Sequence, residues 1–267
     1  MLMLPDKWIR KWQLEKGFER LFAIKGEVFS EQQGRKTIGF TYDKEQYFAK
    51  FHRGIGCKEI LGDIFRLRMP VVGAQNEWKA ILHLKKLNID TIELVGYGKS
   101  GFNPARLNSF VITKELKNTV SLEDFCSKWE KDPPDFLLKR AIIAKVANIA
   151  RILHQNGVNH RDFYICHFLL NNKGGSEKID PASVLLYLID LHRAQIRRKT
   201  PVRWKIKDIA SLFFSSMNIK LSKKDLFRFI KIYTNKPLRW VFDEDKTFWN
   251  KVNKRAVKTY KKFHKIK

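Results

Sequence analysis

The stretch His160-Arg161-Asp162-Phe163-Tyr164-Ile165-Cys166-His167-Phe168-Leu169-Leu170 is the most informative segment of this sequence. It follows a helical run that ends just before Gly157, and a glycine at this position is a common helix stop. The apolar run Phe168 to Leu170 predicts a short buried strand. The pattern therefore places the carboxylate of Asp162 on a loop between a helix and a strand.

A carboxylate on such a loop is what a kinase-type phosphoryl-transfer site requires, because there an Asp orients the attacking hydroxyl and accepts its proton. Protein kinases place an Asn that binds a metal ion five residues after this Asp. Here that position is His167. Imidazole is a poor ligand for Mg²⁺, so either one metal site is weakened or His167 contacts phosphate directly.

The chain supplies the three other protein parts of such a site in the expected order. Lys50 lies mid-strand among apolar residues, where it could hold nucleotide phosphates. Glu77 lies near the start of a helix predicted over 74–87, where it could hold the lysine. Asp190 follows the apolar run 184–189, where it could bind Mg²⁺. Each residue alone has an ordinary structural explanation, but their order and placement together indicate a phosphoryl-transfer site.

The secondary-structure pattern predicts an α+β, two-lobed protein-kinase-like fold. Residues 37–42 and 46–52 alternate in polarity around Asp43-Lys44 and predict a hairpin. Helices are expected at residues 58–68, 74–87, 135–154, 206–217 and 224–233. We therefore expect a small β-rich N-lobe at residues 1–113 and a larger, mostly helical C-lobe at residues 114–267.

Charge is the strongest bulk property of the chain. There are 53 Lys and Arg against 27 Asp and Glu in 267 residues, a formal net charge of +26. Nucleic acid, an anionic membrane surface and an acidic soluble ligand are all compatible partners, as is a basic surface without a dedicated partner. Charge alone does not choose among them.

Other bulk features narrow the class of protein. With 44% hydrophobic residues the chain can bury a core. No apolar run approaches a membrane span, and the first residues lack the pattern of a signal peptide, so we expect a cytoplasmic protein. Cys57, Cys126 and Cys166 have no metal-ligand spacing and are expected to be reduced thiols.

The C-terminal segment 246–267 has nine Lys or Arg and no acidic residue. Its apolar residues recur at helical spacing; they are Trp249, Val252, Ala256, Tyr260 and Phe263. This pattern predicts a basic amphipathic helix of the kind that lies on membrane surfaces. A helix packed on the core by its aromatic stripe is the alternative.

Beyond these patterns, the chain resembles the kinase-like family of lipopolysaccharide core sugar kinases, and within it those that phosphorylate heptose I. The resemblance covers residues 18–240. It is carried by Asn159–Leu170, Ile189–Gln195, Tyr47–Gly54, Met69–Trp78, Lys207–Asp208, Ser215 and Pro237–Arg239. The resemblance implies ATP-dependent phosphorylation of a heptose on the lipid-linked inner core, with Mg²⁺, at the cytoplasmic face of the inner membrane.

The sequence departs from related patterns at several places. Phe163 stands where relatives commonly carry Cys, which we interpret as a packing difference. Only Gly26 and Gly34 are available for a phosphate-covering loop, so nucleotide binding must depend more on Lys50. Asp208 falls where a protein kinase places the buried Asp that braces its catalytic loop.

The acceptor implied by the resemblance is anionic, and a group of basic residues just after Asp190 could grip it, with bidentate bonds from arginine. The candidates are Arg193, Arg197, Arg198, Lys199, Arg203 and Lys205. A solvated basic loop is the alternative. His52 and Arg53 could contact nucleotide or acceptor, and ordinary strand-end packing explains them equally well.

Two other functions remain open from the sequence. One is a kinase-fold enzyme acting on another sugar, a small molecule or a protein. The other is a basic pseudokinase or nucleic-acid-binding module whose binding falls steeply with salt. Retention of Lys50, Asp162 and Asp190 argues against a pseudokinase. The aromatic residues follow apolar periodicities rather than the basic clusters, so no nucleic acid is expected as a partner.

Overall fold

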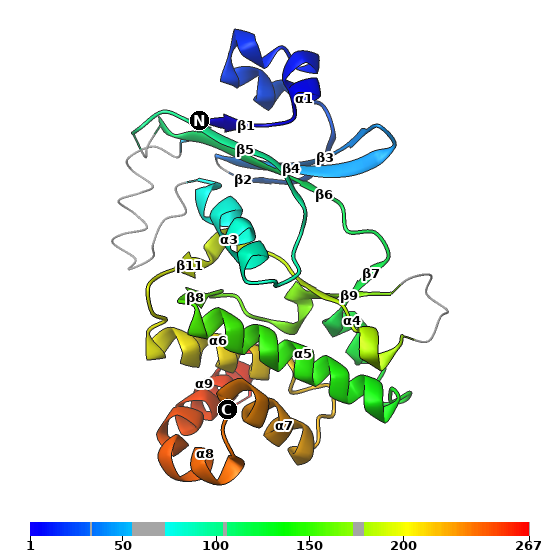
Figure 1. The fold of residues 1–267 in the computed structure, drawn as a ribbon, viewed down its shortest axis with the longest axis vertical. Coiled ribbons are helices and arrows are strands. Elements are labelled where there is room, and N and C mark those ends of the chain that lie inside the picture. Colours follow the sequence, from blue (N-terminus) through cyan, green and yellow to red (C-terminus); the bar gives the residue numbers. More distant parts are fainter. Residues whose placement is uncertain (33, 55–72, 104–105, 173–178, 267) are drawn as a thin grey trace. The chain divides into compact units, whose positions relative to one another are not determined.

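The computed structural model describes residues 1–32, 34–54, 73–103, 106–172 and 179–266. The chain forms two compact units: Met1–His83 with Ile92–Leu116, and Leu84–Thr91 with Lys117–Lys267. The first unit is rich in strands and the second is mostly helical (Figure 1). The predicted α+β class is confirmed, whereas the predicted helix at 58–68 lies outside the described residues.

The first unit is built on a six-stranded antiparallel sheet in the order β1-β5-β6-β4-β3-β2. Its strands are β1 (Leu2–Met3), β2 (Glu27–Gln32), β3 (Arg35–Tyr42), β4 (Glu45–His52), β5 (Leu94–Ser100) and β6 (Asn108–Lys114). The predicted hairpin is β3 and β4, which turn through Asp43 and Lys44 at φ 50° and 64°. Positive φ at both turn residues is the geometry of a tight two-residue hairpin.

The two faces of this sheet pack against different helices. On one face Ala49 and Phe51 of β4 are buried in a core with Trp8 of α1 (Asp6–Lys11). Because side chains alternate along a strand, Lys50 points to the opposite face. That face is covered by α3 (Gln75–Lys86), so α1 and α3 lie on opposite sides of the sheet (Figure 1). Because side chains alternate along β4, Lys50 therefore points toward α3, the helix that bears Glu77.

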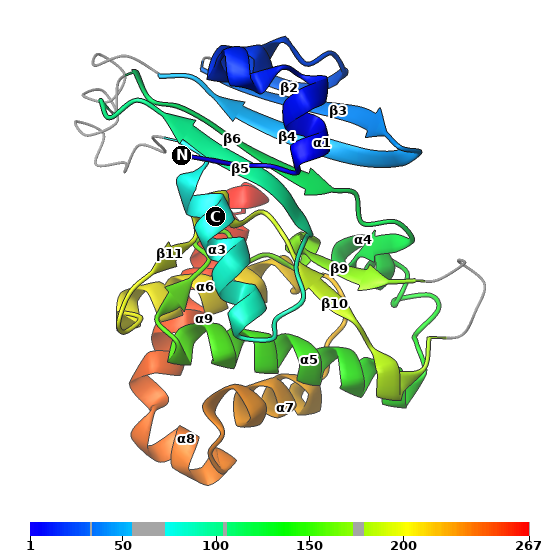
Figure 2. The ribbon, with the colours of Figure 1, turned by 45° about the horizontal axis from the view of Figure 1, so that its top comes forward.

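The second unit is organised around the long helix α5 (Phe136–Gln155). The side chain of Asp135 caps its start by accepting the N–H of Leu137 at 2.8 Å. The other helices are α4 (Leu122–Ser127), α6 (Val202–Ser215), α7 (Lys223–Thr234), α8 (Leu238–Glu244) and α9 (Lys246–Phe263). Helix α5 packs on α7 and α6 packs on α9, as both views show (Figures 1 and 2).

Short strands complete the second unit and flank the loops that bear Asp162 and Asp190. Strand β9 (Phe168–Asn171) lies between β7 (Thr119–Ser121) and β10 (Leu186–Leu188). Strand β8 (Val158–Asn159) pairs with β11 (Gln195–Ile196). The predicted loop-strand order is therefore confirmed: the helix α5 ends, β8 follows, and the segment from His160 leads into β9.

The C-terminal helix α9 is packed on the core. Val252 and Ala256 are buried, and the helix lies along α6. Its apolar stripe is therefore used inside the second unit, as the packed alternative proposed. Among the described residues, no helix has both the length and the apolar character to cross a membrane.

Candidate functional site

The first unit holds the predicted lysine and glutamate. Lys50 Nζ donates to Glu77 Oε1 at 2.7 Å. The Glu77 side chain is only 1% exposed, so it depends on this cation to offset the loss of hydration. Lys50 extends from strand β4 and Glu77 from helix α3. Their ion pair holds the ammonium group of Lys50 in one position.

The second unit holds the two predicted aspartates, of which Asp162 lies on the loop after β8. Arg193 Nη1 donates to both oxygens of the Asp162 carboxylate, at 2.9 and 3.0 Å. Lys207 Nζ lies 3.9 Å from Asp162 Oδ1. The carboxylate thus lies between two cations and is partly accessible, since its side chain is 14% exposed.

Helix α6 holds the backbone just before Asp162. The carboxylate of Asp208, which is fully buried, accepts the backbone N–H of His160 at 2.7 Å and of Arg161 at 2.9 Å. Lys207 donates to the carbonyl of Arg161. Arg161 has φ 77°, a left-handed conformation that costs a non-glycine residue about 1–2 kcal/mol. Both ends of this strained peptide unit are therefore tied to α6.

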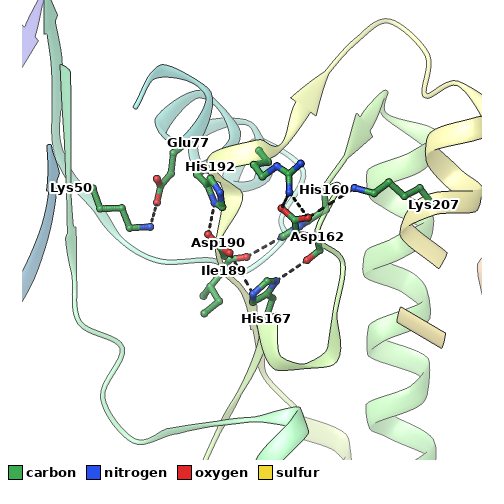
Figure 3. A network of polar contacts seen from close by, with 10 residues as sticks. Lys50, Glu77, His160, Asp162, His167, Ile189, Asp190, His192 and Lys207 are labelled. Atoms are coloured by element: carbon green, nitrogen blue, oxygen red, sulfur yellow. Dashed lines mark hydrogen bonds and ion pairs between the residues drawn. The ribbon is translucent and has the colours of Figure 1, made fainter. Parts of the chain in front are cut away.

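Asp190 follows β10 and lies between two histidines (Figure 3). His192 Nδ1 donates to Asp190 Oδ1 at 2.5 Å. His167 Nε2 lies 3.4 Å from Asp190 Oδ2, and its Nδ1 donates to the carbonyl of Asp162 at 2.7 Å. His167 thus connects the two aspartate-bearing loops of the second unit.

The pKa values of two histidines of this loop, His160 and His167, are shifted in opposite directions. Complete burial lowers the pKa of His160, whose Nε2 donates to the carbonyl of Ile189 at 2.9 Å. Burial also opposes the charge of His167, but hydrogen bonds to Cys166 and to the Asp162 carbonyl, with the nearby charge of Asp190, raise its pKa to about 9. At neutral pH the loop therefore carries a neutral His160 and a cationic His167.

Asp190 fits a Mg²⁺ ion of the kind that binds with a nucleotide. Mg²⁺ is commonly held by one or two carboxylates, with substrate phosphates and waters completing the octahedron. Asp190 provides one part-exposed carboxylate, with a side chain that is 31% exposed. Within the described residues no three His, Cys, Asp or Glu side chains converge as an all-protein metal cage. The donor set therefore suits a metal ion that arrives with phosphates.

The four arginines that were predicted to bind the acceptor lie in three different environments: one contacts Asp162, one contacts β8 and β11, and two are exposed. Arg193 holds Asp162, as described above. Arg197 donates to Asn159 Oδ1 at 2.5 Å and to Gln195 Oε1 at 2.6 Å, and so braces β8 against β11. Arg198 and Arg203 are exposed, and the guanidinium of Arg203 lies over the ring of Trp204. Arg198 and Arg203 are therefore accessible to a ligand from solvent, and the Arg193 side chain is also 37% exposed.

His52 and Arg53 lie in the first unit at the end of β4. His52 is 6% exposed, and the guanidinium of Arg53 lies 4.8 Å from the ring centre of Phe22. The N–H of Arg53 donates to the carbonyl of Gly34 at 2.7 Å. These contacts are those of strand-end packing.

Two residues of the site were not predicted from the sequence. His192 sits two positions after Asp190, and Lys207 directly precedes Asp208. Both lie in segments that carry the family resemblance, Ile189–Gln195 and Lys207–Asp208. The direction in which a side chain points from a 3₁₀ turn or a helix does not follow from the residues next to it in sequence. The predicted helix at 206–217 begins four residues earlier, at Val202, because its first turn is largely exposed and lacks apolar spacing.

Known proteins resemble the chain over nearly its whole length. The model of the lipopolysaccharide kinase (Kdo/WaaP) family matches residues 19–233. The lipopolysaccharide core heptose(I) kinase WaaP of Escherichia coli (strain K12) is 42% identical over 256 residues, covering 96% of each chain. WaaP of Pseudomonas aeruginosa is 40% identical over 261 residues, covering 98% of this chain and 96% of that one.

The fold is shared as well. A solved structure of WaaP in complex with acyl carrier protein superposes with a TM-score of 0.82 at 37% identity, and the match covers 97% of this chain and 99% of that chain. The expected kinase-like fold is thereby confirmed.

Proposed function

Because the chain belongs to the lipopolysaccharide kinase (Kdo/WaaP) family, we propose that it transfers the γ-phosphoryl group of ATP to a hydroxyl of heptose I in the lipopolysaccharide inner core. The relatives that carry the name heptose(I) kinase align over 96% and 98% of this chain. The observation that carries the proposal is the placement of Asp162. Its carboxylate is bonded by Arg193, part-exposed and held on a braced loop that His167 connects to Asp190.

In the proposed reaction Asp162 orients the acceptor hydroxyl and accepts its proton as the oxygen bonds to the γ-phosphorus, and the bond to the leaving ADP oxygen breaks. Lys50, held by Glu77, binds the nucleotide phosphates. Asp190 would hold Mg²⁺, which neutralises charge on the phosphates when it is bound. The raised pKa of His167 favours the imidazolium, which suits contact with a phosphate oxygen.

The acceptor is proposed to be lipid-linked and presented at the cytoplasmic face of the inner membrane. Such an acceptor and the anionic lipids around it attract basic residues at about 1 kcal/mol each. The exposed Arg198 and Arg203 follow Asp190 in the chain and are the basic residues that we assign to acceptor anions. By analogy with the solved relative, an acyl carrier protein is the protein partner that we propose.

The test is transfer of phosphate from ATP to core lipopolysaccharide isolated from cells that lack this protein. The purified protein should add one phosphate to an inner-core heptose, located by mass spectrometry of the core oligosaccharide. Asp162→Asn should lower the rate by about 10²–10⁴-fold, because the proton acceptor is lost while the shape is kept. A fully active Asp162→Asn, or an unchanged core, would exclude the proposal.

A further inference from the structure

Three polar side chains, Tyr233, His154 and Asp208, contact one another in series next to the loop that carries Asp162. Tyr233 on α7 contacts His154 on α5, with 2.8 Å between its hydroxyl and His154 Nδ1. His154 Nε2 lies 3.4 Å from Oδ2 of Asp208 on α6. His154 is 3% exposed and Asp208 is fully buried. Three helices thus contribute one side chain each to a line that ends at the brace of the loop.

The chemistry of the three groups fixes the direction of the hydrogen bonds. A carboxylate only accepts, so the proton between Asp208 and His154 belongs to Nε2 of the imidazole. When the ring carries one proton, at Nε2, its Nδ1 accepts and the hydroxyl of Tyr233 is the donor. Burial and the charge of Asp208 raise the pKa of Tyr233, so the phenol keeps its proton. Tyr233 therefore selects the His154 tautomer that donates to Asp208.

Aromatic contacts hold the ring of Tyr233 in place. Phe229, one turn earlier on α7, stacks on it with 6.0 Å between ring centres. From α9, Trp249 meets it edge to face at 5.8 Å and Phe248 stacks at 6.5 Å. The direction of the hydroxyl is therefore set by two helices, α7 and α9, that contribute none of the proposed reacting groups.

We propose that Tyr233 is a positioning residue for phosphoryl transfer, acting through His154 and Asp208 on the backbone that carries Asp162. This inference rests on the proposed function. Without the hydroxyl, His154 can take its other tautomer or turn away, and Asp208 loses one of its three donors. The carboxylate of Asp208 is then less firmly oriented toward the N–H groups of His160 and Arg161, and the left-handed backbone at Arg161 is less well fixed.

The expected signature is a loss in kcat and not in the KM for ATP. Lys50 and Glu77 belong to the other unit and keep their contact, so nucleotide binding is unchanged. Small displacements of a reacting group cost up to about 100-fold in rate, and we expect Tyr233→Phe to lower kcat by about 10- to 100-fold. The thermal midpoint should stay within a few degrees of that of the wild type.

The matched control is Tyr260→Phe, which removes a phenol hydroxyl that bonds Asn218 Oδ1 at 2.7 Å on the surface of the same unit. It should leave kcat unchanged. The double variant Tyr233→Phe with His154→Ala should lose no more than His154→Ala alone, because both act through one path. Additive losses, or a Tyr233→Phe enzyme with wild-type kcat, would overturn the inference.

A second measurement needs neither an acceptor nor a variant. In the ¹⁵N spectrum of the wild-type imidazole side chains, His154 should show a protonated Nε2 and an unprotonated Nδ1. A protonated Nδ1 would overturn the inference even if Tyr233→Phe failed to fold. Because this readout is independent of turnover, a protein that phosphorylates no core sugar would refute the proposed function while leaving the assignment of Tyr233 separately testable.

Discussion

Asp162 acquires much of its chemical character from residues far from it in sequence. Arg193, thirty-one positions later, donates to both of its oxygens, and Lys207 lies 3.9 Å away. Cations in this position hold the carboxylate in one orientation and remain available to the charge that develops on a transferred phosphoryl group. Arg193, which the sequence predicted to bind the acceptor, therefore contacts Asp162, the proposed base.

We predict that Arg193→Ala lowers phosphate transfer by at least about tenfold, because a part-buried carboxylate loses its orienting donor. Arg193→Lys should retain more activity, since the charge is kept and the planar donor group is lost. Initial rates at saturating ATP measure the effect. Arg10→Ala, which removes an exposed arginine of α1, is the control for a loss of general positive charge. Equal effects from the two alanine variants would contradict the prediction.

Asp225 is the residue whose ionisation should govern acid stability of the second unit. It accepts from Lys139 at 2.9 Å and from Arg228 at 2.9 Å, and it forms a capping box with Ser222 at the start of α7. Burial opposes the charge, but the bonds from Lys139 and Ser222 hold its pKa below the usual 3.8. A lowered folded-state pKa stabilises the protein above the unfolded-state pKa, and that contribution is lost as pH falls through the folded value.

The corresponding prediction is that Asp225→Asn lowers the free energy of unfolding at pH 7 by about 1–3 kcal/mol, because two cations lose their partner. The difference from wild type should begin to shrink as the pH falls below the unfolded-state pKa of about 4, because the carboxylate of the unfolded chain then binds a proton before that of the folded protein does. Urea unfolding at pH 7 and pH 3 measures it. A constant difference at both pH values would contradict the assignment.

At the scale of elements, the end of α5 sets the entry to the Asp162 loop. Gly157 has φ 77°, and its N-terminal neighbour Asn156 closes the helix. A Cβ at Gly157 would lie 1.7 Å from the carbonyl oxygen of Arg197, whose N–H donates to the Gly157 carbonyl at 2.9 Å. The helix can therefore pass into β8 only with a glycine at this position.

We expect Gly157→Ala to lower the free energy of unfolding by about 2 kcal/mol or more, from the left-handed conformation and the backbone clash together. Gly101→Ala is the matched control, because Gly101 also has a positive φ, 94°, while its Cβ would meet a backbone oxygen at an ordinary 3.4 Å. It should cost only about 1 kcal/mol. Denaturant unfolding of both variants separates the clash from the conformational cost; equal losses would show that the clash is relieved.

At the scale of the whole molecule, the charge of +26 is not explained by the reacting groups. Helix α9 buries Val252 and Ala256 and lies along α6, while Phe263 at its C-terminal end is 72% exposed. Its exposed lysines include Lys254, Lys258 and Lys262, which are four residues apart and share one side of the helix. That side can meet an anionic surface by charge alone.

Replacing these three lysines by glutamine should weaken binding to vesicles that contain anionic lipid by about 100-fold, at about 1 kcal/mol for each lysine. Raising the salt concentration should reduce the difference. Co-sedimentation with vesicles measures it, and the same change at the exposed Lys223, Lys224 and Lys231 of α7 is the control. Equal losses from both sets would mean that net charge matters and α9 does not.

The sequence predicted the local framework well. The β3–β4 hairpin, the start of α5 at Asp135 and its stop at Gly157 depend on polarity alternation, capping and glycine geometry within a few residues. The same local patterns put Asp162 and Asp190 on loops beside short strands. The likeness to lipopolysaccharide core sugar kinases is confirmed by the family match. The roles of the individual site residues stay predictions.

Contacts between distant segments were decided by the tertiary structure alone. The contacts of Arg193 with Asp162, His167 with Asp190 and Tyr233 with His154 join side chains that are between 23 and 79 positions apart. Such contacts depend on how helices pack and which rotamer a side chain takes, and neither follows from local periodicity. The packing of α9 is of the same kind, because its amphipathic pattern suits a membrane surface and a protein core equally. Local composition thus specifies the elements, and packing selects the partner of each polar side chain.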